Sequence, residues 1–184
     1  MQTTRKALLA SLLISATVVL GIALAGVPNV ELMTITVFVA GYMLGARLGV
    51  VVGVVSITVH SLLNPLGAAL PPLLLAQVVG FLLIGLGGAL VGPRIASFRY
   101  RLAAILVSGV VGFLLTFIYD ICTNIGAFFT ISGDQAPSSL IKFVTAGLAF
   151  MAMHLVWNAT LFFVVLTPVV VVLKKYRLEI QEGR

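Results

Sequence analysis

Two groups of polar residues stand inside long apolar stretches of the chain, and the spacing of each group places it on one helix face. The first group comprises Thr116, Tyr119, Asp120, Thr123 and Asn124. The second comprises His154, Trp157 and Asn158. A few convergent polar groups beside aromatic rings are typical of a small-molecule binding site. A carboxylate close to tyrosine or tryptophan also suits a cationic or heteroaromatic ligand.

The composition excludes a soluble globular protein. Of the 184 residues, 61% are hydrophobic and 9% are charged, against roughly 45–50% and about 25% in an ordinary soluble domain. A protein of this size cannot bury so many apolar side chains away from water. We therefore expect an all-α integral membrane protein. A bilayer span needs roughly 20 apolar residues, which leaves room for about six spans with short loops.

Turn-forming or charged residues divide the chain into six apolar runs, which predict a six-transmembrane-helix bundle forming a single membrane domain over residues 1–184. The expected spans cover residues 7–25, 32–44, 48–63, 70–91, 102–127 and 140–173. The second and third spans are short, which predicts tilting, local thinning of the bilayer or a partly re-entrant path. A cleaved signal peptide is the alternative for the first run, because Ala23-Leu24-Ala25 suits a signal-peptidase site.

The positions of the basic residues predict that the N and C termini are both cytoplasmic. With six spans in this orientation, ten of the eleven lysines and arginines lie inside and Lys142 alone lies outside, in agreement with the positive-inside rule. Glu31, Asp120 and Asp134 then fall on or near the outer side. The basic residues are scattered between apolar runs, so the net charge of +6 does not indicate a nucleic-acid partner.

In this topology most of the polar residues lie near the outer leaflet, where they would line an outward-facing pocket. The candidate substrate-binding residues are Asn29, Glu31, Asn64, Tyr119, Asp120, Asn124, His154, Trp157 and Asn158. Further polar residues near this pocket are His60, Ser61 and Gln77. The alternative is that Tyr119 and Trp157 belong to the aromatic belt of the membrane interface, and that His154 only hydrogen-bonds a neighbouring helix.

Known motifs for nucleotide, metal or nucleophile chemistry are missing. The sequence has no G-x-x-x-x-G-K-[ST] P-loop and no H-E-x-x-H zinc motif. Two histidines are too few for a zinc site, and the lone Cys122 gives neither an internal disulfide nor a thiolate cluster. No serine beside a glycine has an evident base. We expect no catalytic residue, no metal and no cofactor, and hence a protein that is not an enzyme.

Small residues recur at four-residue spacing, which lets helix backbones approach closely in lipid. The second and third spans carry Gly41, Gly45, Gly49 and Gly53, and the end of the fourth carries Gly85, Gly88, Ala89 and Gly92. In the first span, Ala7, Ser11 and Ser15 form a similar stripe. This stripe is expected either to pack inside the protein or to dock another membrane subunit.

Three segments carry a family resemblance. They are Pro28-Asn29-Val30-Glu31-Leu32 before a short span, the hairpin through Gly41, Gly45, Arg47 and Gly49, and the Asn64-Pro65 loop. Together they resemble the substrate-binding S components of energy-coupling factor (ECF) transporters. The resemblance extends over most of the chain in size, six-helix count and cytoplasmic termini.

The resemblance implies a receptor in the plasma membrane of a prokaryote that binds a vitamin or related micronutrient at its outer side. Such a receptor works with a transmembrane T subunit and two ATPase subunits and topples in the bilayer to deliver its ligand. In the family, an Ala-x-x-x-Ala stripe on the first helix forms the docking surface. Ala7, Ser11 and Ser15 occupy the corresponding positions here. They keep the small size but depart from the alanine pattern, which leaves the mode of T-subunit docking open.

Two other functions compete with this interpretation. One is a structural or assembly subunit whose glycine-rich faces pack against other membrane proteins. The other is an autonomous carrier or channel, although the six runs show no clear inverted repeat. For a receptor, the scarcity of cations on the outer side argues against a ligand with several carboxylates or phosphates and favours a neutral or cationic heterocycle.

Overall fold

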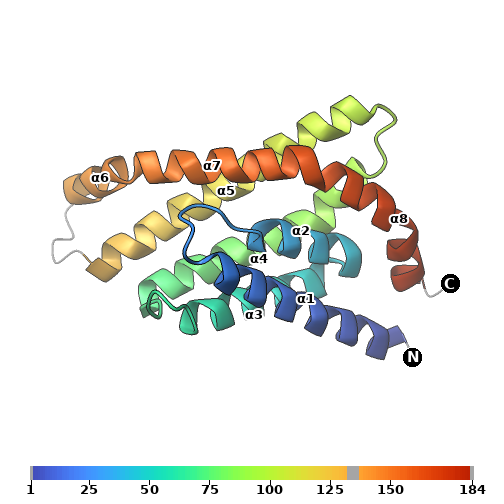
Figure 1. The fold of residues 1–184 in the computed structure, drawn as a ribbon, viewed down its shortest axis with the longest axis horizontal. Helices are drawn as coiled ribbons and strands as arrows, with labels where there is room; N and C mark the ends of the chain where they lie inside the picture. Colours follow the sequence, from blue (N-terminus) through green and yellow to red (C-terminus); the bar gives the residue numbers. More distant parts are fainter. Residues whose placement is uncertain (1, 132–136, 183–184) are drawn as a thin grey trace.

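The computed structural model describes residues 2–131 and 137–182, which form helices joined by short connections (Figure 1). The elements are α1 (Gln2–Leu24), α2 (Met33–Leu44), α3 (Ala46–Leu62), α4 (Pro71–Ile95), α5 (Arg101–Ile131), α6 (Pro137–Ala146), α7 (Leu148–Leu161), the π-helical turn η1 (Phe162–Leu166) and α8 (Thr167–Glu182). Within the described ranges the fold is therefore all-helical, as the composition predicts.

Four helical segments among the described residues are long and apolar enough to cross a membrane: Thr3–Leu24, Pro71–Ile95, Arg101–Ile131 and Leu148–Gln181. With 12 and 17 residues, α2 and α3 extend only about 18 and 25 Å at a rise of 1.5 Å per residue. Large apolar side chains point outward, and Leu12 and Val156 are 66% and 67% exposed. A surface of this kind suits contact with lipid. The chain is a multi-pass membrane protein.

Both termini lie at the same end of the molecule, together with the α2–α3 turn and the α4–α5 connection (Figure 1). The described basic residues follow this arrangement, because they stand in the first turns of α1, at the start of α3, around the α4–α5 connection and in α8. Lys142, in α6, is the described exception. Asp134, which the sequence places on the outer side, lies outside the described residues.

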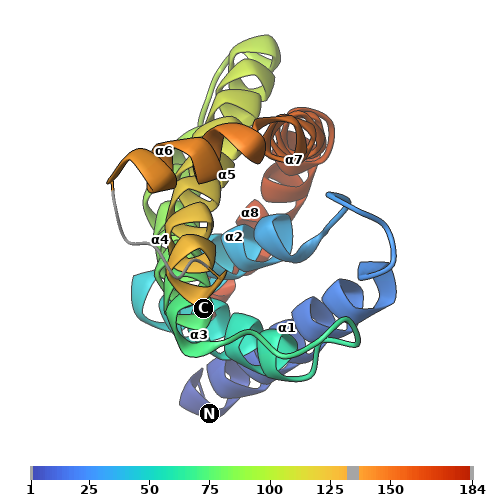
Figure 2. The ribbon, with the colours of Figure 1, turned by 90° about the vertical axis from the view of Figure 1, so that its left-hand side faces the viewer.

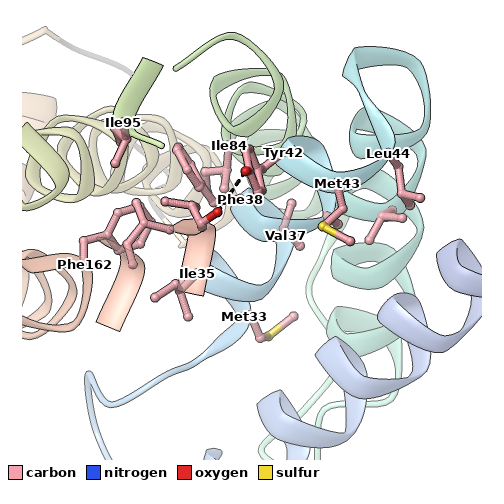
Figure 3. Packing of buried hydrophobic residues seen from close by; sticks show 14 of the residues in the cluster. Met33, Ile35, Val37, Phe38, Tyr42, Met43, Leu44, Ile84, Ile95 and Phe162 are labelled. Atoms are coloured by element: carbon pink, nitrogen blue, oxygen red, sulfur yellow. Dashed lines mark hydrogen bonds between the residues drawn. The ribbon is translucent and has the colours of Figure 1, made fainter. Parts of the chain in front are cut away.

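Helix α2 occupies the centre of the bundle (Figure 2), and ten of its 12 residues are buried. A helix that is apolar on every side is stable only when other elements surround it. Phe38 of α2 meets Phe162 edge to face, with ring centroids 5.3 Å apart (Figure 3). The Tyr42 hydroxyl donates a hydrogen bond of 2.9 Å to the carbonyl of Val170 in α8. The hydrophobic core is therefore built around this short helix.

Glycines bring α2, α3 and α4 into backbone contact. A Cβ atom at Gly85 would overlap the carbonyl of Gly49, and one at Gly41 would overlap the carbonyl of Gly85. A Cβ at Gly88 would likewise overlap the carbonyl of Phe38. The four-residue spacing thus predicts the packing faces correctly. Gly45 has another role, since its φ of +86° forms the turn between α2 and α3.

Side chains from α8 cap the carboxyl end of α2. The last carbonyls of a helix have no partner inside it, and basic groups stabilise this negative end of the helix dipole. Arg177 Nε donates to the carbonyl of Tyr42 at 2.9 Å, and Gln181 Nε2 donates to that of Met43 at 3.3 Å. The C-terminal helix is thereby fixed to the central one.

The expected span over residues 140–173 contains two departures from a regular helix. Gly147 separates α6 from α7, and α6 leans on α5 through Phe143 and Phe128, whose ring centroids are 5.8 Å apart. Further along, η1 precedes Pro168, which has no N–H to donate to the preceding turn. A π-helical turn accommodates one extra residue. The hydropathy pattern that predicted this span indicates neither the break at Gly147 nor the π-helical turn.

Substitution of Gly85 by alanine is expected to destabilise the bundle, because the added Cβ meets the backbone of α3 rather than a movable side chain. Overpacking of this kind costs roughly 1–3 kcal/mol. The matched control is Gly87→Ala in the same helix, where the Cβ meets only the tip of the Leu115 side chain, at 3.3 Å. Thermal unfolding of the detergent-solubilised protein measures the stability of both variants. Equal thermal midpoints for the two variants would contradict the backbone contact.

Candidate binding site

A cavity of about 480 Å³ lies between the α1–α2 connection, the α3–α4 connection and the adjacent parts of α5 and α7. These connections are at the end of the molecule opposite the termini (Figure 1). The polar lining consists of Asn29, Glu31, His60, Asn64, Gln77, Tyr119, Asp120, Thr123 and His154. The apolar lining comes mainly from α1 and the segment that follows it, with Met33, Leu66 and Phe150.

The imidazole of His154 lies between two carboxylates. Its Nδ1 donates to Asp120 Oδ1 at 2.7 Å, and its Nε2 is 3.7 Å from Glu31 Oε1. Both ring nitrogens face acceptors, so the doubly protonated ring satisfies the arrangement best. His154 and Asp120 are 8% and 5% exposed. This polar cluster therefore joins α5, α7 and the α1–α2 connection at the wall of the cavity.

Local structure holds Glu31 in place. It stands two residues before the start of α2, and its Oε2 accepts a hydrogen bond of 2.9 Å from the Thr34 amide in the first turn of that helix. Its own carbonyl accepts a 3.0 Å bond from Trp157 Nε1 in α7. Burial by itself raises the pKa of the Glu31 carboxyl, but His154 and Thr34 stabilise the carboxylate, so its pKa lies below the ordinary value for glutamate. Glu31 is therefore a carboxylate at neutral pH.

The aromatic wall of the cavity is centred on Tyr119. Its ring meets Phe81 edge to face at 5.5 Å between centroids and the His154 ring at 6.0 Å. The ring packs directly on Gly80, where a Cβ would be 2.5 Å from Tyr119 Cδ2. On the opposite side, a Cβ at Gly21 of α1 would come within 2.6 Å of His60 Cδ2. Glycines in α1 and α4 thus make room for the rings that line the cavity.

Four buried polar atoms of the lining have no hydrogen-bond partner within the described residues. They are Asn29 Nδ2, Glu31 Oε1, His60 Nδ1 and Asp120 Oδ2. Each such atom costs free energy unless something pairs with it. Their gathering around one cavity is what a site for a polar small molecule requires. Within the described residues no group of three His, Cys, Asp or Glu residues is placed to hold a metal ion.

The structure brings six of the nine predicted site residues to this cavity: Asn29, Glu31, Asn64, Tyr119, Asp120 and His154. The other three lie elsewhere. Asn124 lines a neighbouring cavity of about 380 Å³ and donates to the Asp120 carbonyl at 2.7 Å. Trp157 lines an apolar groove of about 450 Å³ on the other side of the α1–α2 connection. Asn158 is fully buried one helical turn further into the bundle.

The cavity also contains residues outside the predicted set, among them Gly21, His60, Gln77, Thr123 and Phe150. His60 and Gln77 stand out in the sequence as polar groups inside apolar runs, and Thr123 shares the helix face of Asp120. These signals were sufficient to find the three polar residues. Phe150 extends the helix face of His154, four residues before it. Gly21 carries no polar or spacing signal for the cavity, because only the approach of α1 to the other helices brings it there.

Substitution of Asp120 by alanine is expected to lower the free energy of unfolding by about 1–3 kcal/mol, because it leaves the buried His154 ring without its close acceptor. Asn124→Ala is the control, since that amide bonds only to a backbone carbonyl of its own helix. Thermal unfolding in detergent measures the stability of both variants against that of the wild type. A D120A protein as stable as the wild type would show that the 2.7 Å contact contributes nothing to the fold.

Comparison with known proteins identifies the family. A model of the family described as "ECF transporter, substrate-specific component" matches residues 5–173, which is most of the chain. Neither a search of curated proteins nor a search of solved structures returned a match. The members of this family are subunits of transporters. The family match extends from α1 into the first part of α8 and includes every residue of the cavity. The chain thus belongs to the family of substrate-specific S components of ECF transporters.

Proposed function

We propose that this S component captures a vitamin or related small heterocyclic micronutrient at the outer membrane face and delivers it inward with a T subunit and two ATPase subunits. The observation that carries the proposal is the cavity with its four unpartnered polar atoms. The cavity lies at the end of the bundle away from the termini and from most of the basic residues. A receptor that collects a solute from outside needs its site at that end.

The proposed topology has six crossings, in which α2 and α3 cross as short helices. Four of the crossings coincide with the long apolar segments. The α2–α3 turn lies at the same end as the termini (Figure 1), which is where it belongs if both short helices cross. Arg47 stands just after that turn. With this end cytoplasmic, the positive-inside rule is satisfied, and the membrane is the plasma membrane of a prokaryote.

The stripe of Ala7, Ser11 and Ser15 is the proposed docking surface for the T subunit. All three residues are exposed on α1, and Ser11 Oγ donates only to the Ala7 carbonyl of its own helix, at 3.1 Å. The stripe therefore takes no part in the packing of this chain. Small exposed residues at this spacing permit a second helix to approach closely.

The glycine-rich faces favour the receptor over a structural or assembly subunit. Gly41, Gly49 and Gly85 contact one another inside this chain, so they are not available to another protein. An assembly subunit also has no use for unpartnered polar groups around a cavity. An autonomous carrier or channel remains the alternative that flux measurements address.

The first expected result is that Ala25→Phe abolishes ligand binding while Ala23→Phe retains it. Ala25 lines the cavity, whereas the neighbouring Ala23 is exposed and outside it. Native mass spectrometry of the protein purified without added ligand detects a bound small molecule directly. Wild type and A23F are expected to carry one, and A25F none. A small molecule retained equally by A25F would place the site elsewhere, and none on the wild type even after incubation with vitamins would contradict the proposal.

The second expected result concerns docking. The double substitution Ser11→Leu and Ser15→Leu is expected to prevent co-purification with the T subunit and ATPases, because two bulky side chains separate the helix surfaces. Ala149→Leu, a substitution of an exposed small residue on α7, is the matched control. Co-expression of the transporter subunits followed by affinity purification measures assembly. Normal assembly of the double variant would exclude this stripe as the docking surface.

A further inference from the structure

The chemistry of the unpartnered atoms restricts what the cavity can bind. Glu31 Oε1 and Asp120 Oδ2 are carboxylate oxygens, which accept hydrogen bonds and donate none. Asn29 Nδ2 donates only, and His60 Nδ1 donates or accepts according to its tautomer. A complementary ligand therefore carries hydrogen-bond donors for two carboxylates and an acceptor for the amide.

The two carboxylates come from different parts of the fold and contact different nitrogens of His154. Asp120 approaches from α5 and Glu31 from the segment before α2. A single N–H group of a ligand cannot reach both Glu31 Oε1 and Asp120 Oδ2, the two carboxylate oxygens without a hydrogen-bond partner, because the imidazole ring of His154 stands between the carboxylates. The ligand therefore needs at least two N–H donors that point in different directions.

The charge of the site has a definite sign. The lining contains no lysine or arginine, and against the two carboxylates the His154 ring supplies at most one positive charge. The second histidine of the lining, His60, makes no ion pair within the described residues and is neutral at pH 7. The two carboxylates therefore leave the site with a net negative charge. Because their buried surroundings reduce screening by water, the site attracts cations and repels anions. The Tyr119 and Phe150 rings in the lining add favourable faces for a positive group.

We infer that the ligand is a compact organic cation with at least two N–H donors that point in different directions, of the kind presented by an amidinium or a protonated amino-heterocycle, in contact with both Glu31 and Asp120. This inference rests on the proposed function and specifies its substrate class. It excludes ligands that carry a carboxylate or a phosphate. It also assigns Glu31 and Asp120 a joint role in ligand recognition.

Three probes of nearly the same shape test the inference: benzamidinium, benzamide and benzoate. They share one ring with a planar substituent and differ in charge and in the number of N–H donors. The full-length protein in detergent is heated with each probe at several concentrations, and a ligand that binds the folded state raises the thermal midpoint. We expect benzamidinium to stabilise most, benzamide less and benzoate not at all. Equal stabilisation by benzoate, or none by benzamidinium, would overturn the inference.

Two substitutions assign the effect to the site. Glu31→Gln and Asp120→Asn are each expected to raise the benzamidinium concentration for half-maximal stabilisation about tenfold or more, the usual loss for a hydrogen bond to a charged group. E31Q keeps an oxygen for the Thr34 amide, so it remains informative if D120N folds poorly. Glu179→Gln in α8, far from the cavity, is the matched control and should not change the response. Unchanged responses in both site variants would contradict the inference.

Failure of the inference and failure of the proposed function give different results. If native mass spectrometry finds a co-purified anion that A25F lacks, the chain is still a receptor but the cationic ligand class is wrong. If the wild type carries no small molecule, gains no stability from vitamins and assembles with no T subunit, the proposed function itself fails.

Discussion

The position of the His154 ring between the carboxylates of Asp120 and Glu31 determines how the end of the protein opposite the termini is organised. In lipid no water is available to satisfy buried polar groups, so they must find partners within the chain or in a ligand. The ring occupies one oxygen of Asp120 and faces one of Glu31. It thereby ties α5, α7 and the α1–α2 connection together and leaves an Asp120 oxygen unpaired beside the cavity.

The rest of the fold supports this cluster without taking part in it. Backbone contacts at glycines set the distances among α2, α3 and α4. Arg177 and Gln181 of α8 fix the opposite end of α2 by capping its carbonyls. Because Glu31 stands two residues before α2 and accepts a hydrogen bond from its first turn, a rigidly held α2 also gives that carboxylate a rigid base. The Trp157 bond to the Glu31 carbonyl completes the support from the α7 side.

The sequence predicted the membrane class and the helical faces that pack or carry polar groups, because hydropathy and three- to four-residue spacing are local properties. It did not predict which face meets which helix. Asn158 shares the face of His154 but lies too deep for the cavity, and Trp157 points to a groove beside it. His60 and Gln77 reach the cavity only through the register of α3 and α4. The break at Gly147 is equally invisible to hydropathy.

The separation between glycine packing and ligand contacts has a consequence for how such receptors diversify. The contacts at Gly41, Gly49 and Gly85 tolerate no side chain, whereas many cavity residues stand in connections or at helix ends. Mutations in those connections can alter what is recognised without disturbing the bundle. Selection can therefore change the ligand while the scaffold stays fixed.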